Sequence, residues 1–249
     1  MDANAPLLGE PLPVELMNTI WADRNGVHDA LRDTDGTRAW LHAVSSRTDL
    51  MAPADLAALT APDLDRLGDR LVRLRDALRR LAAEVTGDPR PSAASDVRRL
   101  HAAVTQLNRI AADTPHWASL SWAPGEEPAR HVRTSGPPVP AAVSAIAQEA
   151  VSLFSQNARR QLRACLAPGC VLYFLKNHPR REWCSTGCGN RARSARHYRR
   201  RRQSADRDGL GVRICGMCGL PDMAAGPPSR KSCSCSGPSS SEKESGERP

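Results

Sequence analysis

Cys165-Leu-Ala-Pro-Gly-Cys170 and Trp183-Cys-Ser-Thr-Gly-Cys-Gly-Asn-Arg191 decide how the C-terminal half of the chain folds. Their four cysteines have the spacing C-x4-C-x13-C-x3-C. Two close pairs of thiols suit a structural zinc site, because tetrahedral Zn²⁺ takes four thiolates from two short turns. Pro168-Gly169 supplies a turn within the first pair, and Ser185 can cap a helix whose first turn holds the last cysteine. Zinc ligation by Cys165, Cys170, Cys184 and Cys188 is the prediction, and buried thiols or disulfides are the alternative.

The basic charge of the chain is concentrated in the same region. The whole chain of 249 residues has a net charge of +8, but residues 159–213 alone carry +12 and residues 1–158 carry −4. A local positive field of that size favours a polyanion, most simply nucleic acid. A solvated basic helix without a partner is the alternative.

The stretch Asn190–Arg202 predicts an arginine-rich helix with its alanines packed on the zinc core. The other side of the helix is then free to contact a phosphate backbone or to enter a major groove. Asn190 and Arg191 could read bases, since both side chains can bond a base edge bidentately. Alternatively they act locally, Asn190 in a turn and Arg191 paired with Glu182. The predicted contacts to double-stranded DNA are Asn190, Arg191, Arg193, Arg196, His197, Arg200 and Arg201.

Two groups of residues resemble a known family. Trp183-Cys-Ser, Cys188-Gly-Asn-Arg191 and the Ala/Arg-rich run resemble the CGNR zinc finger, which in bacteria follows the ABATE-type domain of proteins classed as stress-induced transcription regulators. Asn18-Thr19 with Arg24, Asp33 and Trp40-Leu41 resemble the start of that domain. The resemblance implies a zinc-bound, DNA-binding module whose ligands are the same four cysteines.

Upstream of the cysteines the pattern predicts a mainly α (α+β) fold. Leucines recur at steps of three and four from Leu64 to Leu81, and Gly87 stands at the expected stop, which indicates one long amphipathic helix. It could pack within the domain or support a homodimeric coiled coil. A second helix is expected after Ser95-Asp96, with its apolar side made of Val97, Leu100, Val104, Leu107 and Ile110.

Three further stretches complete the N-terminal prediction. Residues 14–24 could begin as a strand or as a helix. Residues 116–135 predict a two-stranded hairpin with Trp117 and Trp122, which must pack on the helices because an isolated hairpin is marginal. A helix then leads from the connector Gly136–Pro140 toward Cys165. Asn18, Asp23 and Arg24 could line a pocket for a small-molecule effector, or hold a turn as buried polar residues.

These observations divide the chain into a helical regulatory domain (1–164), a zinc finger (165–204) and a largely disordered tail (205–249). The tail contains Ser, Gly, Pro and Glu in excess, which favours disorder. It also contains Cys215, Cys218, Cys233 and Cys235, whose spacing C-x2-C-x14-C-x-C could form a second zinc site.

The predicted function is that of a zinc-dependent, DNA-binding transcription regulator with a sensing or dimerisation domain. An enzyme is not expected, because four cysteines leave zinc no open position for water and no nucleotide-binding or hydrolase motif is found. RNA binding and protein interaction through the finger are the alternatives. No signal peptide or membrane span is predicted, so the expected compartment is the reducing cytoplasm.

Overall fold

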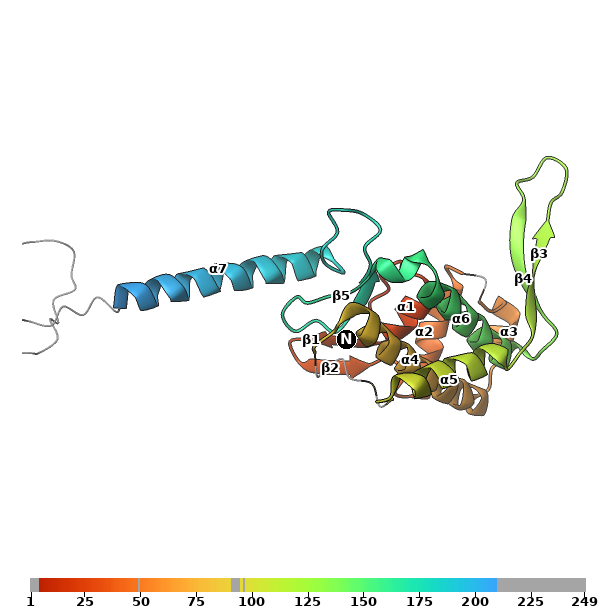
Figure 1. Ribbon diagram of the computed structural model, residues 1–249. Helices are drawn as coiled ribbons and strands as arrows, with labels where there is room; N and C mark the ends of the chain where they lie inside the picture. The colour runs from red at the N-terminus through yellow and green to blue at the C-terminus, as the bar shows by residue number, and fades with distance from the viewer. Residues whose placement is uncertain (1–4, 49, 91–94, 96, 210–249) are drawn as a thin grey trace, which may run out of the picture. The chain divides into compact units, whose positions relative to one another are not determined.

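The computed structural model describes residues 5–48, 50–90, 95 and 97–209, and helices predominate there (Figure 1). The helices are α1 (Leu12–Met17), α2 (Thr34–Ser45), α3 (Pro53–Ala57), α4 (Ala61–Thr86), α5 (Leu100–Ala112), α6 (Pro138–Ser155), the 3-10 turn η2 (Asn157–Arg160) and α7 (Thr186–Gly209). The strands form three antiparallel pairs, β1–β2 (Ile20–Asp23, Gly26–Asp29), β3–β4 (His116–Ser121, Ala129–Thr134) and β5–β6 (Leu162–Ala164, Tyr173–Leu175). The predicted mainly α, α+β class is confirmed.

Two predictions fall outside these residues. The tail beyond residue 209, with Cys215, Cys218, Cys233 and Cys235, is not among the described residues. Its disorder and its second metal site therefore stay predictions. Within the described part of the chain, no helix is long and apolar enough to cross a membrane.

Helix α4 is the element on which the N-terminal helices pack. Thr60 and Asp63 close a capping box at its start, and Gly87 ends it in the left-handed conformation with φ 61°. The leucine stripe is buried against α1, α2, α5 and α6 of the same chain. The predicted helix, its stop and its packing within the domain are confirmed. The stripe is not available for a coiled coil.

Helix α5 buries the predicted side, but small residues take its most buried positions. Ala103, Leu107 and Ala111 are buried, whereas Leu100 and Val104 are exposed. Val97 and Ile110 of the predicted side pack partly buried against the core. The helix packs against α4 and α6, and small alanine side chains let helices approach closely. The prediction therefore located the buried side but not the alanines beside Leu107.

The ambiguous stretch near the N-terminus contains both kinds of element. Helix α1 ends at Met17, and strand β1 begins three residues later at Ile20. The following helix α2 starts with Asp33 as its cap, whose carboxylate accepts the Gly36 N–H at 2.8 Å. Asp33 therefore fixes the start of the helix that carries Trp40.

Residues 116–135 form the predicted hairpin, but its tryptophans do not pack on the helices. Strands β3 and β4 pair in register from His116↔Thr134 to Ser121↔Ala129. Figure 1 shows the hairpin standing away from the helices. Trp117 and Trp122 are both exposed, so the expected packing is wrong.

The short pair β5–β6 joins the helices to the cysteine region. Because side chains of a strand alternate between its two faces, β6 contributes to two clusters. Tyr173 is buried in the core of the N-terminal helices. Phe174 is buried with the four cysteines in a second cluster, against which Trp183 packs. Strand β6 therefore lies between the two cysteine pairs and contributes a side chain to each cluster.

Candidate metal centre and basic helix

The four cysteines of the sequence motif meet at one buried point. Their sulfur atoms all lie within 4.8 Å of one another. The Cys184 and Cys188 sulfurs are 3.4 Å apart, and those of Cys170 and Cys184 are 3.8 Å apart. Sulfurs of a tetrahedral site with metal–sulfur bonds of about 2.3 Å lie roughly 3.8 Å apart. The four thiols therefore form a cluster that fits one tetrahedral metal ion such as Zn²⁺.

The first pair of cysteines sits on a tight turn between β5 and β6. The Cys165 N–H donates to the Leu172 carbonyl at 2.9 Å, and the Cys170 N–H donates to the Ala167 carbonyl at 2.9 Å. Gly169 has φ 71°, which favours glycine because a Cβ is strained there. The predicted Pro-Gly turn thus aims both sulfurs at the same point.

The second pair of cysteines is placed by the start of α7. The Ser185 hydroxyl accepts the Cys188 N–H at 3.3 Å, as expected for a helix cap. Gly189 is buried, and a Cβ at this position would lie 3.2 Å from Trp183 Cδ1. Glycine therefore lets the helix approach the tryptophan ring. Ala192, one turn further, is buried as predicted.

Two residues predicted to read bases make local bonds in the structure. Arg191 Nη2 donates to Cys188 Sγ at 2.9 Å, and that bond raises the pKa of Arg191. Neighbouring thiols, Cys165 foremost, lower the pKa of Cys188. Asn190 Oδ1 accepts a bond from Arg193. In place of Glu182, the partner weighed as an alternative for Arg191, the structure has a sulfur of the thiol cluster.

Arg90, from the loop after α4, binds the turn that carries the first cysteine pair. Its Nη1 donates to the carbonyls of Cys165 and Cys170, each at 2.8 Å. Its Nε and Nη2 donate to the two oxygens of Asp88 at 2.7 and 2.5 Å. Asp88 also accepts the Tyr173 hydroxyl at 2.8 Å. One guanidinium therefore links the thiol cluster to the N-terminal core.

A second set of bonds fixes β6 to α1 and α4. The Asn18 side chain accepts the Tyr173 N–H at 2.8 Å and donates to its carbonyl at 2.9 Å, as a neighbouring strand would. Arg79, fully buried on α4, donates to the carbonyls of Met17 and Val171 at 2.8 and 3.4 Å. Asn18 therefore has the structural role weighed as an alternative to pocket lining.

Sequence reasoning missed Arg79, Asp88 and Arg90. For Arg79 a signal existed, because this arginine and Arg75 occupy positions next to the leucine stripe of α4 where apolar residues are expected. A charge at such a position indicates a buried polar partner. Nothing in the local sequence pairs Asp88 with the Tyr173 hydroxyl, or Arg90 with the Cys165 and Cys170 carbonyls, all of them more than 70 residues away.

The remaining predicted DNA contacts are solvent-exposed. They are Arg193, Arg196 and His197 in the first part of α7, and Arg200 and Arg201 in its continuation. Tyr198 is exposed among them. DNA contact by these side chains, and by Asn190 and Arg191, stays a prediction.

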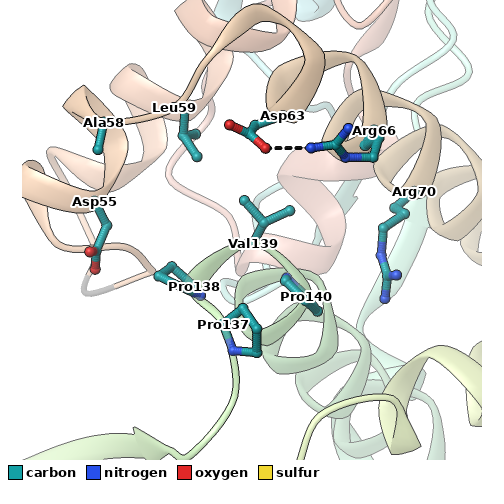
Figure 2. Close-up of a pocket in the computed structure, with 10 residues that line it drawn as sticks. All are labelled: Asp55, Ala58, Leu59, Asp63, Arg66, Arg70, Pro137, Pro138, Val139 and Pro140. Atoms are coloured by element: carbon teal, nitrogen blue, oxygen red, sulfur yellow. Dashed lines mark hydrogen bonds and ion pairs between the residues drawn. The ribbon is translucent and has the colours of Figure 1, made fainter.

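A cavity of about 400 Å³ lies elsewhere in the N-terminal domain (Figure 2). Leu59, Val139 and the neighbouring prolines form apolar walls, and Arg66 and Arg70 of α4 also line it. Arg66 is paired with Asp63 at 2.6 Å, and Arg70 is paired with Asp113. Asn18, Asp23 and Arg24 are not among its lining residues. Asp23 instead holds the β1–β2 turn by accepting the Asn25 N–H at 2.7 Å.

We predict that Arg90 determines both stability and metal retention. Arg90→Leu leaves the buried Asp88 carboxylate without its guanidinium, which costs roughly 3–5 kcal/mol for a broken buried pair. Removing the bonds to the cysteine carbonyls should weaken metal affinity by about 10–100-fold. Urea unfolding and competition with a chelator measure the two effects.

Two further variants make the Arg90 test specific. Arg90→Lys keeps a cation beside Asp88 but lacks the forked donors of arginine. Relative to Arg90→Leu, it should therefore restore much of the free energy of unfolding but little of the metal affinity. Arg99→Leu, at an exposed arginine, is the control. The prediction would be contradicted if Arg90→Leu and Arg99→Leu had the same free energy of unfolding and the same metal affinity.

Comparison with known families agrees with this arrangement. Residues 161–201 match the CGNR zinc finger, and residues 10–157 match ABATE, the family described as "Putative stress-induced transcription regulator". No curated protein matches the chain significantly. The predicted resemblance is confirmed in both segments, and the longer match covers more than half of the 249 residues. The chain therefore belongs to the ABATE family and carries a CGNR zinc finger after its ABATE domain.

Proposed function

We propose that the chain is a zinc-dependent transcription regulator, responsive to stress as its family description suggests, that binds double-stranded DNA. The observation that carries the proposal is the link between the thiol cluster and α7. Cys188 lies in the first turn of this helix, and the helix then presents one exposed basic side chain after another. Arg193, Arg196 and His197 belong to the same compact unit as the thiol cluster, so fixing the helix start places these three side chains next to it, where a polyanion can contact them.

Zinc suits the donor set of this site. Four thiolates are the ligands of structural zinc sites, and they leave no coordination position open for a reacting water. When bound, the ion would fold the turn of Cys165 and Cys170 onto the start of α7. Arg191 would then offset part of the negative charge of the thiolates through its bond to Cys188. This role is structural, and it argues against an enzyme.

We propose different roles on DNA for the exposed basic residues of α7 and for the residues that already make local hydrogen bonds. The proposed phosphate contacts are side chains that face solvent and are positively charged or can become so: Arg193, Arg196, His197, Arg200 and Arg201. Asn190 remains the candidate for base reading through its amide nitrogen, since its oxygen is bonded to Arg193. Arg191 would position the Cys188 sulfur rather than read a base.

RNA binding and protein interaction are the competing functions. RNA readers commonly expose several aromatic side chains for stacking, and in the described part of α7 only Tyr198 is aromatic. This favours duplex DNA. A cytoplasmic site of action fits the proposal, because free thiols that bind metal need a reducing compartment.

We place the proposed small-molecule effector in the cavity of Figure 2. Its volume falls in the usual range of about 300–1,000 Å³, and its apolar walls suit an apolar molecule. Asp55 and Asp63 also line it, so one anionic group on that molecule would compete with Asp63 for Arg66 or with Asp113 for Arg70. With 2-naphthoate as the probe, the melting temperature should rise with concentration. Val139→Trp, which fills the cavity, should abolish the rise, and 2-naphthamide should give a smaller one. An unchanged response of Val139→Trp would place the probe elsewhere.

We predict that Cys184→Ser and Cys188→Ser each lose the zinc held by the first four cysteines. Metal analysis of the purified proteins measures this, and circular dichroism should show a loss of helix from α7. Truncation after Ser204 tests the tail cysteines separately. If they form a second site, the full chain binds one zinc more than the truncated chain, and equal contents would make the tail cysteines incidental. Full zinc retention by both serine variants would refute the ligand assignment.

We predict a steep salt dependence for DNA binding. Arg193→Ala, Arg200→Ala and Arg201→Ala should each weaken binding to a selected duplex and to a scrambled duplex alike. Removing one arginine–phosphate interaction should reduce the slope of log affinity against log salt by roughly 0.9. Asn190→Ala should weaken binding to the selected duplex only, and by less than the roughly 1–3 kcal/mol of a bidentate contact, because only the amide nitrogen is free to bond a base.

The control for the DNA test is Arg109→Ala, an exposed arginine of α5 outside the basic helix. It should leave both affinities and the slope unchanged. Wild-type binding that is insensitive to salt, or tighter binding to single-stranded RNA than to the duplex, would overturn the proposal.

A further inference from the structure

The β3–β4 hairpin exposes more apolar surface than a hairpin in water normally retains. The exposed fractions are 53% for Trp117, 70% for Leu120 and 68% for Trp122. Leu120 and Ala118 share one face of β3 by strand alternation, and Trp117 lies on the other. A two-stranded hairpin is marginally stable by itself, and exposed apolar surface of this kind marks an interaction site.

The base of the hairpin is fixed to the helices, so the arm is presented in a defined direction. The buried Ser144 of α6 donates to the carbonyls of Ala111 and Thr114 at 2.8 and 3.3 Å. Thr134 Oγ1 donates to the Pro115 carbonyl at 3.1 Å and accepts the Gly136 N–H at 3.1 Å. Because its base is fixed in this way, the hairpin presents the outer edges of its two strands to solvent, where another chain can pair with them.

The two edges of the hairpin differ in charge. Within the described residues β3 pairs with β4 alone, so each strand has one edge whose backbone groups are open. Residues 117–121 of β3 read Trp-Ala-Ser-Leu-Ser and carry no charge, whereas β4 carries Arg130 and Arg133. Charged residues on an edge strand oppose pairing with another chain, and an uncharged edge permits it.

We infer that the β3–β4 hairpin is a dimerisation arm, which pairs antiparallel along β3 with the same strand of a second copy of this chain. The product is a four-stranded sheet with the arginine-bearing β4 strands at its outer edges. A two-fold axis perpendicular to this sheet keeps its faces distinct, so the Ala118/Leu120 face of one copy continues into that of the other. Pairing through β4 would instead bring like charges together.

The same charge pattern limits the assembly to two copies. Pairing through β3 uses the open uncharged edge of each copy, and the charged β4 edges do not accept a third. This dimer does not depend on DNA binding. Only one consequence rests on the proposed function: two basic helices related by a two-fold axis would favour operators with inverted half-sites.

The experiment measures the mass of the full chain in solution without DNA, by light scattering after size-exclusion chromatography. Wild-type protein should have the mass of a dimer. Leu120→Lys and Leu120→Glu should each be monomeric with an unchanged circular dichroism spectrum, because each puts the same charge on the β3 edge of both copies, and charged edges oppose pairing. An equimolar mixture of the two variants should regain the dimer mass.

The control is Val27→Lys, which makes the same change at an exposed residue of the β1–β2 hairpin and should leave the dimer intact. A monomeric wild type, or Leu120 variants that remain dimeric, would overturn the inference. A monomer whose tryptophan fluorescence shifts with anionic lipid vesicles would assign the hairpin to a membrane surface instead. Loss of DNA binding with an intact dimer would count against the proposed function alone.

Discussion

The ion pair of Asp88 and Arg90 is the interaction on which the arrangement of the two domains depends. The Asp88 side chain is 0% exposed, and such a burial is costly unless every acceptor site is used. Burial acts to raise the pKa of this carboxyl, but bonds from Arg90 and Tyr173 outweigh it and hold the pKa below its ordinary value. Because Arg90 also binds the carbonyls of Cys165 and Cys170, satisfying the carboxylate fixes the cysteine turn in place.

This constraint makes the zinc finger part of the N-terminal core rather than an appended module. Tyr173 is buried between helices, its ring lies near both Arg79 and Arg90, and burial raises its pKa to about 12. Asn18 completes the attachment by bonding the backbone of the same residue. Any displacement of the C-terminal end of α4 is therefore transmitted to the turn that aims two of the four sulfurs.

The signature residues Cys188-Gly-Asn-Arg191 have structural roles that do not depend on contact with nucleic acid. Glycine permits the approach of Trp183, and arginine donates to a sulfur of the cluster. A thiolate cluster concentrates negative charge, so a donor of this kind lowers the cost of holding it in a small core. Of the basic residues that follow in α7, Arg193 bonds Asn190, and the exposed Arg196, Arg200 and Arg201 are assigned to phosphates with it.

The sequence by itself determined the features that depend on neighbouring residues. Cysteine spacing located the thiol cluster, and the leucine repeat with Gly87 located α4 and its end, because turn and helix geometry act over a few residues. Only the tertiary structure decided which partners lie far apart in the chain. It placed Arg90 on the Cys165 and Cys170 carbonyls, buried Ala103 and Ala111 of α5 more deeply than Leu100 and Val104, and left Trp117 and Trp122 in solvent. The physical reason is that the partner of a buried charge or an apolar ring is a residue that the fold brings next to it. The spacing of apolar residues along the chain does not identify that partner.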